Sequence, residues 1–307
     1  MQLALSTRWN ASRHKSGEAM IEEILNLGIR HVELGYDFTL DLVPGVMKMV
    51  AEKAVTVDSL HNFCPVPFGA PMGHPELFQL SSLERGGRES AVRYTAKTVE
   101  FASDVGAKCV VVHAGNVDMT NRTGDLLTLC EKGQQYSPRF DKIKMKLLMK
   151  REKKVKKHLD SLYRSIDEIL PILSRTGVRL AFENLPSWES IPCESEMEEI
   201  LKRYEMPLIG YWHDIGHGQI RQNLGFISYK LWLNRFASRL AGMHIHDVAP
   251  PAHDHLMPPR GNVDFAGFKT YLKSDTVLVL EPAPYTPETD IRDGMRVIGE
   301  AWEIPAS

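Results

Sequence analysis

Four residues that can bind a metal ion, Glu183, Asp214, His244 and Glu281, each stand at or next to the end of a short apolar run. Each run reads as a buried strand that gives way to a loop. The ends of parallel strands meet at one edge of a sheet, where α/β proteins build their sites. Carboxylates brought together there repel each other unless a cation neutralises them. Two Glu, one Asp and one His form a ligand set suited to a divalent ion.

The alternative for any one of these residues is a helix cap or half of a salt bridge. All four in register, at spacings of 31, 30 and 37 positions, fit one strand and one helix per step and favour the metal site. We expect Mn²⁺ or Zn²⁺ as the cofactor, with Co²⁺ and Mg²⁺ as alternatives.

The elements that must position these residues alternate along the chain. Apolar runs predict strands at 2–5, 30–35, 55–63, 108–113, 179–183, 208–213, 240–246 and 276–280. Helical spacing predicts helices at 16–27, 43–54, 90–105, 159–173, 194–204, 228–236, 265–272 and 287–302. Eight such pairs predict a (β/α)₈ barrel as a single domain over residues 1–307. The rival, an open doubly wound sheet, normally carries a Gly-rich phosphate loop, and the sequence has none.

Residues 119–157 interrupt this alternation after the fourth strand. The segment is rich in Lys and Arg, and Leu147, Leu148 and Met149 within it favour helix. We therefore predict a basic helical insertion on the active-site side of the barrel, as a lid, a partner surface or a track for a phosphate backbone.

Composition narrows the class of protein. A net charge of −2 gives no overall attraction to nucleic acid or to an anionic membrane, and no apolar run approaches the ~18 residues that span a bilayer. No signal peptide is evident, and four scattered cysteines indicate reduced thiols in a cytoplasmic protein. Whether the chain forms a homo-oligomer stays open.

The motifs around the four residues resemble the xylose isomerase-like barrel superfamily, which includes sugar phosphate isomerases, epimerases and endonuclease IV. The similar segments are Phe182-Glu183-Asn184, Asp214-Ile215-Gly216-His217, His244-Ile245-His246-Asp247 and Glu281. The resemblance implies that Glu183, Asp214, His244 and Glu281 bind the metal. His246 lies on the same strand face as His244 and is a second candidate for that ligand.

Family members that act on sugars use the two metal glutamates as an acid/base pair, which implies that Glu183 and Glu281 carry the proton. Removing a proton next to a sugar carbonyl needs a base near the carbon and a cation that polarises the oxygens. His217 is expected to orient the substrate hydroxyls, with a structural role as the alternative.

Further histidines match positions in endonuclease IV. His61, His113 and His255 correspond to zinc ligands of that enzyme, but His253 stands where its cluster needs an acid. This departure counts against three metals, although Asp254 is adjacent. Sugar-acting relatives keep some of these histidines as substrate ligands, so we expect His61, His113, His246 and His255 to contact substrate.

Three other residues are candidates for substrate contacts, each with a structural alternative. Glu33 can face the barrel mouth or form a buried salt bridge. Trp188 can stack on a sugar ring or belong to the core. Arg260 can bind a phosphate or lie in solvent on its loop.

The sequence therefore predicts a metal-dependent isomerase or epimerase of a small sugar, sugar phosphate or polyol. The alternative is a zinc-dependent endonuclease that cuts DNA at abasic sites, for which the basic insertion would contact phosphates. The sugar-like motifs and the overall charge favour the first function and make a nucleic acid partner unexpected. A barrel without activity is disfavoured because the ligand set is complete.

Overall fold

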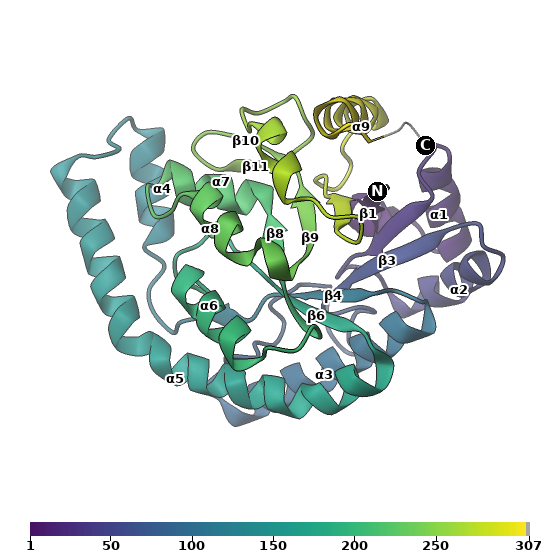
Figure 1. The fold of residues 1–307 in the computed structure, drawn as a ribbon, viewed down its shortest axis with the longest axis horizontal. Coiled ribbons are helices and arrows are strands. Elements are labelled where there is room, and N and C mark those ends of the chain that lie inside the picture. The colour runs from purple at the N-terminus through teal and green to yellow at the C-terminus, as the bar shows by residue number, and fades with distance from the viewer. Residues whose placement is uncertain (305–307) are drawn as a thin grey trace.

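Eight parallel strands close into a barrel in the computed structural model, which describes residues 1–304 (Figure 1). Around the barrel the order is β1, β2, β3, β4, β6, β8, β9 and β12. Their bounds are β1 Leu3–Ser6, β2 His31–Leu34, β3 Thr56–His61, β4 Cys109–Val112, β6 Arg179–Glu183, β8 Ile209–Asp214, β9 Leu240–Ile245 and β12 Val277–Leu280. The predicted (β/α)₈ barrel is confirmed.

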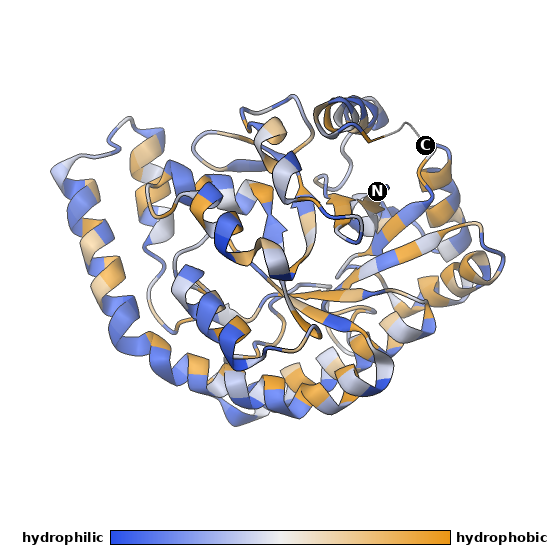
Figure 2. Cartoon of the chain, in the orientation of Figure 1, coloured by the Kyte–Doolittle hydropathy of each residue, from blue (hydrophilic) through white to orange (hydrophobic). Residues whose placement is uncertain are grey.

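The strands are apolar on both faces because both faces are covered. Ala4, Val111, Ala181 and Val279 belong to a small cluster with Trp212, separate from the main core that Leu5, Val110 and Leu180 form with the helices. This two-sided burial explains why the strands read as continuous apolar runs (Figure 2).

Helices follow most strands and form an outer layer. Their bounds are α1 Gly17–Leu25, α2 Val43–Ala51, α3 Arg85–Asp104, α4 Thr123–Glu131, α5 Pro138–Thr176, α6 Glu194–Arg203, α7 Ile215–Asn223, α8 Tyr229–Phe236 and α9 Glu288–Trp302. Short 3₁₀ helices are η1 Thr7–Trp9, η2 Ala11–Arg13, η3 Leu40–Leu42, η4 Ala237–Arg239 and η5 Phe265–Tyr271. Two antiparallel strand pairs lie outside the barrel: β5 Gly115–Asn116 pairs with β7 Ser190–Ile191, and β10 Asp247–Ala249 forms a hairpin with β11 His253–Leu256.

The segment after β4 is helical, as predicted, but its boundary differs from the prediction. α5 runs without a break for 39 residues, so the second half of the predicted insertion and the predicted helix at 159–173 are one element. Ser137 caps its start by accepting the Phe140 N–H, and Gly177 ends it in the left-handed conformation (φ 73°). No glycine or proline interrupts residues 139–170, so nothing in the sequence stops the helix there.

A second difference lies after β8, where the sequence suggested a loop and the structure has α7. Asp214 caps this helix by accepting the His217 N–H at 2.6 Å. Gly216 and Gly218 obscured the helix, since glycine disfavours helices. A Cβ on Gly216 would lie 2.0 Å from Cε1 of His246, so close packing requires glycine there. Residues 265–271 also differ, forming a 3₁₀ helix.

No helix within residues 1–304 combines the length and the apolar character needed to cross a membrane.

Candidate metal and substrate site

The carboxyl ends of the strands bring most of the predicted site residues together. Strand register places Asp214 beside His244, and His244 beside Val279, two residues before Glu281. Ligand atoms of Glu183, Asp214 and His244 lie within 4.8 Å of one another, as do those of Asp214, His246 and Glu281. The side chains of all these residues are buried at the barrel mouth.

His244 lies at the centre of this group. Its Nδ1 atom is 3.0 Å from Oε1 of Glu183, 3.5 Å from Oε2 of Glu281 and 3.7 Å from Oδ2 of Asp214. Burial acts to lower the pKa of His244, but the carboxylates of Glu281, Glu33 and Glu183 outweigh it and raise that pKa well above its usual value. The three predicted carboxylate ligands therefore surround Nδ1 of the fourth predicted ligand, His244.

Glu33 lies behind His244 and away from the cleft. The carboxylate is fully buried, accepts hydrogen bonds from the hydroxyls of Ser6 (3.2 Å) and Ser59 (2.8 Å), and lies 3.1 Å from Nε2 of His244. Burial acts to raise the pKa of Glu33, but the neighbouring His244 outweighs it and lowers that pKa. An ionised Glu33 accepts the Nε2 proton of His244 and leaves Nδ1 facing the other carboxylates. It is thus placed to orient His244, and this buried contact corresponds to the salt bridge predicted as the alternative to substrate binding.

His61 and His113 converge on the other oxygen of Glu183. Their Nε2 atoms lie 3.2 and 3.1 Å from Oε2 of Glu183. Burial acts to raise the pKa of Glu183, but His244, His113 and His61 outweigh it and hold that pKa well below its usual value. Glu183 is therefore ionised, with both oxygens facing imidazoles.

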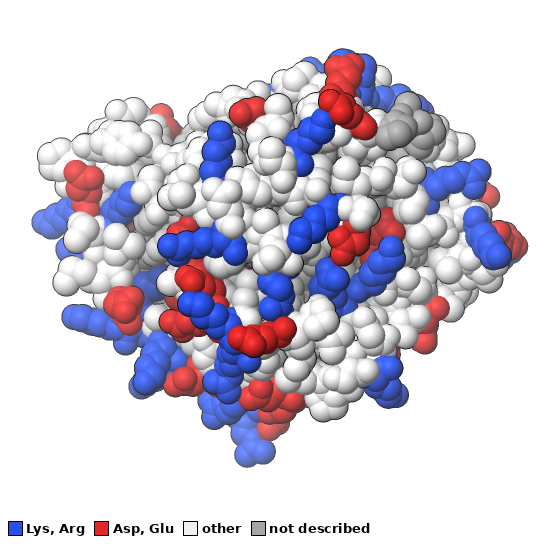
Figure 3. Space-filling model, in the orientation of Figure 1, with Lys and Arg blue, Asp and Glu red and all other residues white. Residues whose placement is uncertain are grey.

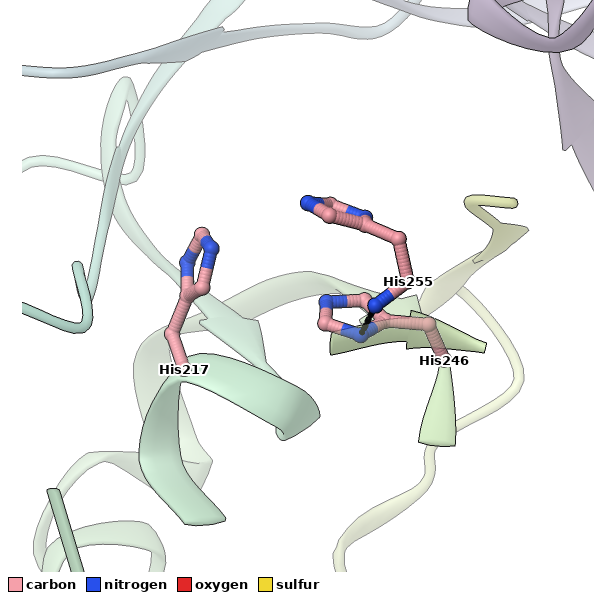
Figure 4. Close-up of side chains that lie close together, drawn as sticks. All are labelled: His217, His246 and His255. Carbon is pink, nitrogen blue, oxygen red and sulfur yellow. Dashed lines mark hydrogen bonds between the residues drawn. The ribbon is translucent and has the colours of Figure 1, made fainter. Parts of the chain in front are cut away.

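Three histidines form the opposite side of the mouth (Figure 4). His217, in the first turn of α7, donates its Nδ1 proton to the Asn184 carbonyl at 3.1 Å, which leaves Nε2 as an acceptor. The His246 ring stacks on the His255 ring at 4.2 Å, and His217 meets both rings edge-on.

A cleft of about 440 Å³ opens beside this cluster, within the usual range for small-molecule sites. His113 and His217 line it at the cluster end. Its remaining lining residues are His74, Pro75, Glu76, Asn116, Val117, Met119, Asn121, Leu185, Pro186, Ser187, Glu189 and Ser190. Lysine and arginine are absent from this lining, so the polar groups that the cleft offers to a ligand are hydroxyl, amide, imidazole and carboxylate groups, set among apolar side chains.

Two predicted residues lie elsewhere. Trp188 packs with Phe226 at 4.6 Å between ring centroids, in a small apolar cluster with α4 and α5. The exposed Arg260 guanidinium pairs with Asp290 of α9 at 2.6 Å. The structure does not bring either residue to the cleft lining.

The sequence interpretation missed Arg8 and Asn184. Arg8 Nη1 lies 3.0 Å from both ring nitrogens of His255 and 3.8 Å from Oε1 of Glu281. Asn184 bonds the backbone of Asp214 twice, at 2.8 and 2.9 Å, and so joins the ends of β6 and β8. Both follow a predicted strand end, the same signal that identified the other site residues.

The donor set fits a divalent cation. Glu33, Glu183, Asp214 and Glu281 are at most 3% exposed, and four carboxylates at this depth need compensating positive charge. Three of them face one imidazole nitrogen, a mixed oxygen and nitrogen set that suits Mn²⁺, Zn²⁺ or Co²⁺.

A (β/α)₈ barrel with carboxylates and histidines at the carboxyl ends of its strands defines the class of this protein. Residues 21–301 match the family described as the xylose isomerase-like TIM barrel, and the chain belongs to that family. An uncharacterized protein of Methanocaldococcus jannaschii is 24% identical over 274 residues, covering 89% of this chain and 88% of the relative.

Solved structures share the fold over nearly the whole chain. A D-tagatose 3-epimerase-like protein superposes with a TM-score of 0.71 at 18% identity, covering 99% of this chain and 98% of that one. The 3-keto-D-glucoside 4-epimerase of E. coli gives 0.69 at 15%, covering 98% and 99%. The IolI protein, crystallised with a zinc atom, gives 0.67 at 14%, covering 99% and 98%.

Proposed function

We propose that this protein is a divalent-metal-dependent isomerase or epimerase that acts on a small sugar, sugar phosphate or polyol. The observation that carries the proposal is the convergence of Glu183, Asp214 and Glu281 on Nδ1 of His244. These four residues would hold Mn²⁺ or Zn²⁺. When bound, the ion would polarise the substrate oxygens next to the carbon that loses its proton.

Glu183 and Glu281 are the proposed acid/base pair. Glu183 has the low pKa of a carboxylate surrounded by imidazoles, so it is ionised and can accept a proton. Glu281 lies within reach of Arg8 and His255 at 3.8 and 3.7 Å, which hold its carboxylate in place. Contacts on both carboxylates limit their movement, which favours a fixed geometry for proton transfer.

Residues that line the cleft are proposed to orient the substrate. The Nε2 atom of His217 can accept a hydrogen bond from a substrate hydroxyl, and His113 lines the same cleft. The cleft also offers Glu76 and Asn116, which are joined by a 3.0 Å hydrogen bond, as further partners for hydroxyls.

The names of the structural relatives support a sugar-acting enzyme, since two of them are sugar epimerases or similar to one. The zinc atom in the IolI protein supports a divalent metal. A cytoplasmic location stays a proposal that rests on the four scattered cysteines, all of them free.

Reconstitution with metal tests the proposal. Protein stripped with EDTA and reloaded with Mn²⁺, Zn²⁺, Co²⁺ or Mg²⁺ should interconvert at least one member of a panel of ketoses, keto-glycosides, polyols and their phosphates. The Asp214→Asn and His244→Ala variants should lose bound metal and activity, whereas Asp167→Asn, at an exposed position on α5, should keep both. Full metal content in both site variants would contradict the ligand assignment.

A further inference from the structure

His246 has both ring nitrogens engaged within the protein. The residue follows directly on β9 and is fully buried. Its Nδ1 atom accepts a hydrogen bond from the backbone N–H of His255 at 2.9 Å, the dashed line in Figure 4. Its Nε2 atom lies 3.0 Å from each oxygen of Asp214.

These contacts assign the protons on the ring. A backbone N–H can only donate, so Nδ1 of His246 must be the acceptor and carry no proton. The proton of the neutral imidazole is therefore on Nε2, where it is donated to the Asp214 carboxylate. No lone pair remains for a metal ion, although His246 lies in a group with His217 and His255 whose spacing could suit one.

The surrounding backbone is shaped around this ring. Any side chain larger than glycine at position 216 would collide with it, since a Cβ there would lie 2.0 Å from Cε1 of His246. His255 adopts a positive φ of 53°, a conformation that residues with side chains rarely occupy. The hydrogen bond to His246 is one of the contacts that hold this backbone in place.

His255 links His246 to Glu281 at the barrel mouth. Its own Nδ1 donates to the backbone carbonyl of Glu281 at 3.2 Å. A chain of contacts therefore runs from Asp214 through His246 and His255 to Glu281, and it joins two proposed metal ligands on different strands.

We infer that His246 is a positioning residue that couples Asp214 to the β10–β11 hairpin, and that it binds neither the metal nor the substrate. It fixes the orientation of the Asp214 carboxylate and the position of His255 with the same ring. This inference rests on the proposed function, because Asp214 matters as a ligand only if the site holds a divalent ion.

Two substitutions separate the two hydrogen bonds. Gln at position 246 can supply a donor near the place of Nε2, for Asp214, but lacks the acceptor at Nδ1. Asn at this position can supply an acceptor near the place of Nδ1, for the His255 N–H, but lacks the donor at Nε2. Two readouts are followed: the affinity for Mn²⁺ alone, by calorimetry, and the hydrogen exchange of the His255 amide. His158→Asn is the control, because His158 of α5 is also a buried histidine with both ring nitrogens engaged, by the backbone of Asp118 and of Ser81, and neither partner is a proposed ligand.

Opposite patterns are expected. His246→Asn should lower the Mn²⁺ affinity about 10-fold or more, the usual effect of losing a residue that orients a ligand, and keep the His255 amide protected. His246→Gln should keep the affinity near wild type and expose that amide to exchange. The control should lower stability without changing either readout.

Equal losses of Mn²⁺ affinity in both variants would identify His246 as a ligand and overturn the inference. Wild-type affinity and wild-type protection in both variants would also overturn it, because His246 would then position neither Asp214 nor His255. If either variant fails to fold, Gly216→Ala displaces the same ring without altering its chemistry. It should lower both the affinity and the protection, and unchanged values would contradict the inference. A wild-type protein that binds no Mn²⁺ would instead reject the proposed function, while the exchange pattern at His255 would still test the hydrogen bond.

Discussion

Glu33 and His244 form a fully buried pair in which Nε2 of the imidazole lies 3.1 Å from one carboxylate oxygen and 3.2 Å from the other. The pair lies at the ends of strands that are not neighbours in the barrel, β2 and β9. Arrangements in which a carboxylate orients a histidine ligand are common at metal sites, where they fix the ring and raise its basicity.

Weakening this pair should weaken metal binding. We expect Glu33→Gln to lower the Mn²⁺ affinity about 10-fold, since a neutral amide holds the Nε2 proton less strongly than a carboxylate. Ser59→Ala, which removes one hydrogen bond to Glu33, should have a smaller effect in the same direction. Calorimetric titration measures both, and an unchanged affinity in Glu33→Gln would show that the pair is only structural.

The stability of the protein should depend on the ionisation of Asp37. Burial raises the pKa of Asp37 to about 6 from 3.8, and its Oδ1 has no hydrogen-bond partner among the described residues. Because the folded-state pKa is the higher one, the stabilising effect of the protonated form is present below pH 3.8 and is lost as the pH rises through 6. Asp37→Asn imitates the protonated form.

Urea unfolding from pH 4 to pH 7 is the measurement. Relative to the wild type, Asp37→Asn should gain stability with rising pH, so that its advantage is largest at pH 7. A difference that stays constant over this range would contradict the raised pKa.

A buried ion pair fastens the long helix to the barrel. Arg151 of α5 pairs with Glu196 of α6 through its two terminal nitrogens, with Nη2 at 2.8 Å from Oε2, and Nη2 also donates to the Ser190 carbonyl. Arg151→Ala leaves the Glu196 carboxylate buried without its partner, which typically costs about 3–5 kcal/mol. Lys150→Ala, at the exposed neighbouring position, should change the free energy of unfolding by less than about 0.5 kcal/mol. Similar values for the two variants in urea unfolding would show that the pair contributes little.

The barrel was predictable because buried parallel strands leave a strong pattern, and the residues at their ends followed from that pattern. Glu183, Asp214, His244 and Glu281 were identified in this way. The start of α7 was not, because glycine is disfavoured in a helix. Gly216 is needed there to make room for the ring of His246, which follows β9 thirty positions later in the chain.

The roles of individual side chains were harder to predict than their positions. Glu33 and His246 lie where expected, but what they contact depends on which way each side chain points. Trp188 and Arg260 were predicted to contact substrate because they are near Glu183 and His255 in the sequence. Local partners, Phe226 and Asp290, engage them instead.

DNA binding by the lysines of α5 would separate the sugar-enzyme function from the nuclease function. Figure 3 shows Lys and Arg mixed with acidic side chains along the edge that α5 forms. Exposed lysines on this helix include Lys150, Lys153, Lys154 and Lys157. We expect no tight binding of abasic duplex DNA at physiological salt, and no change when these four are replaced by Gln. Gel shifts at two salt concentrations measure this, and tight binding that depends on both salt and these lysines would favour the nuclease function.

Exchange of substrate hydrogen with solvent tests the central claim most directly, because it reports the proton transfer itself. The metal-loaded enzyme, incubated in D₂O with a sugar that it converts, should place deuterium on the reacting carbon. Glu183→Gln and Glu281→Gln should each reduce this exchange about 10²-fold or more, since both remove a group that carries the proton. Exchange at the wild-type rate in either variant, with metal still bound, would contradict the assignment of that glutamate.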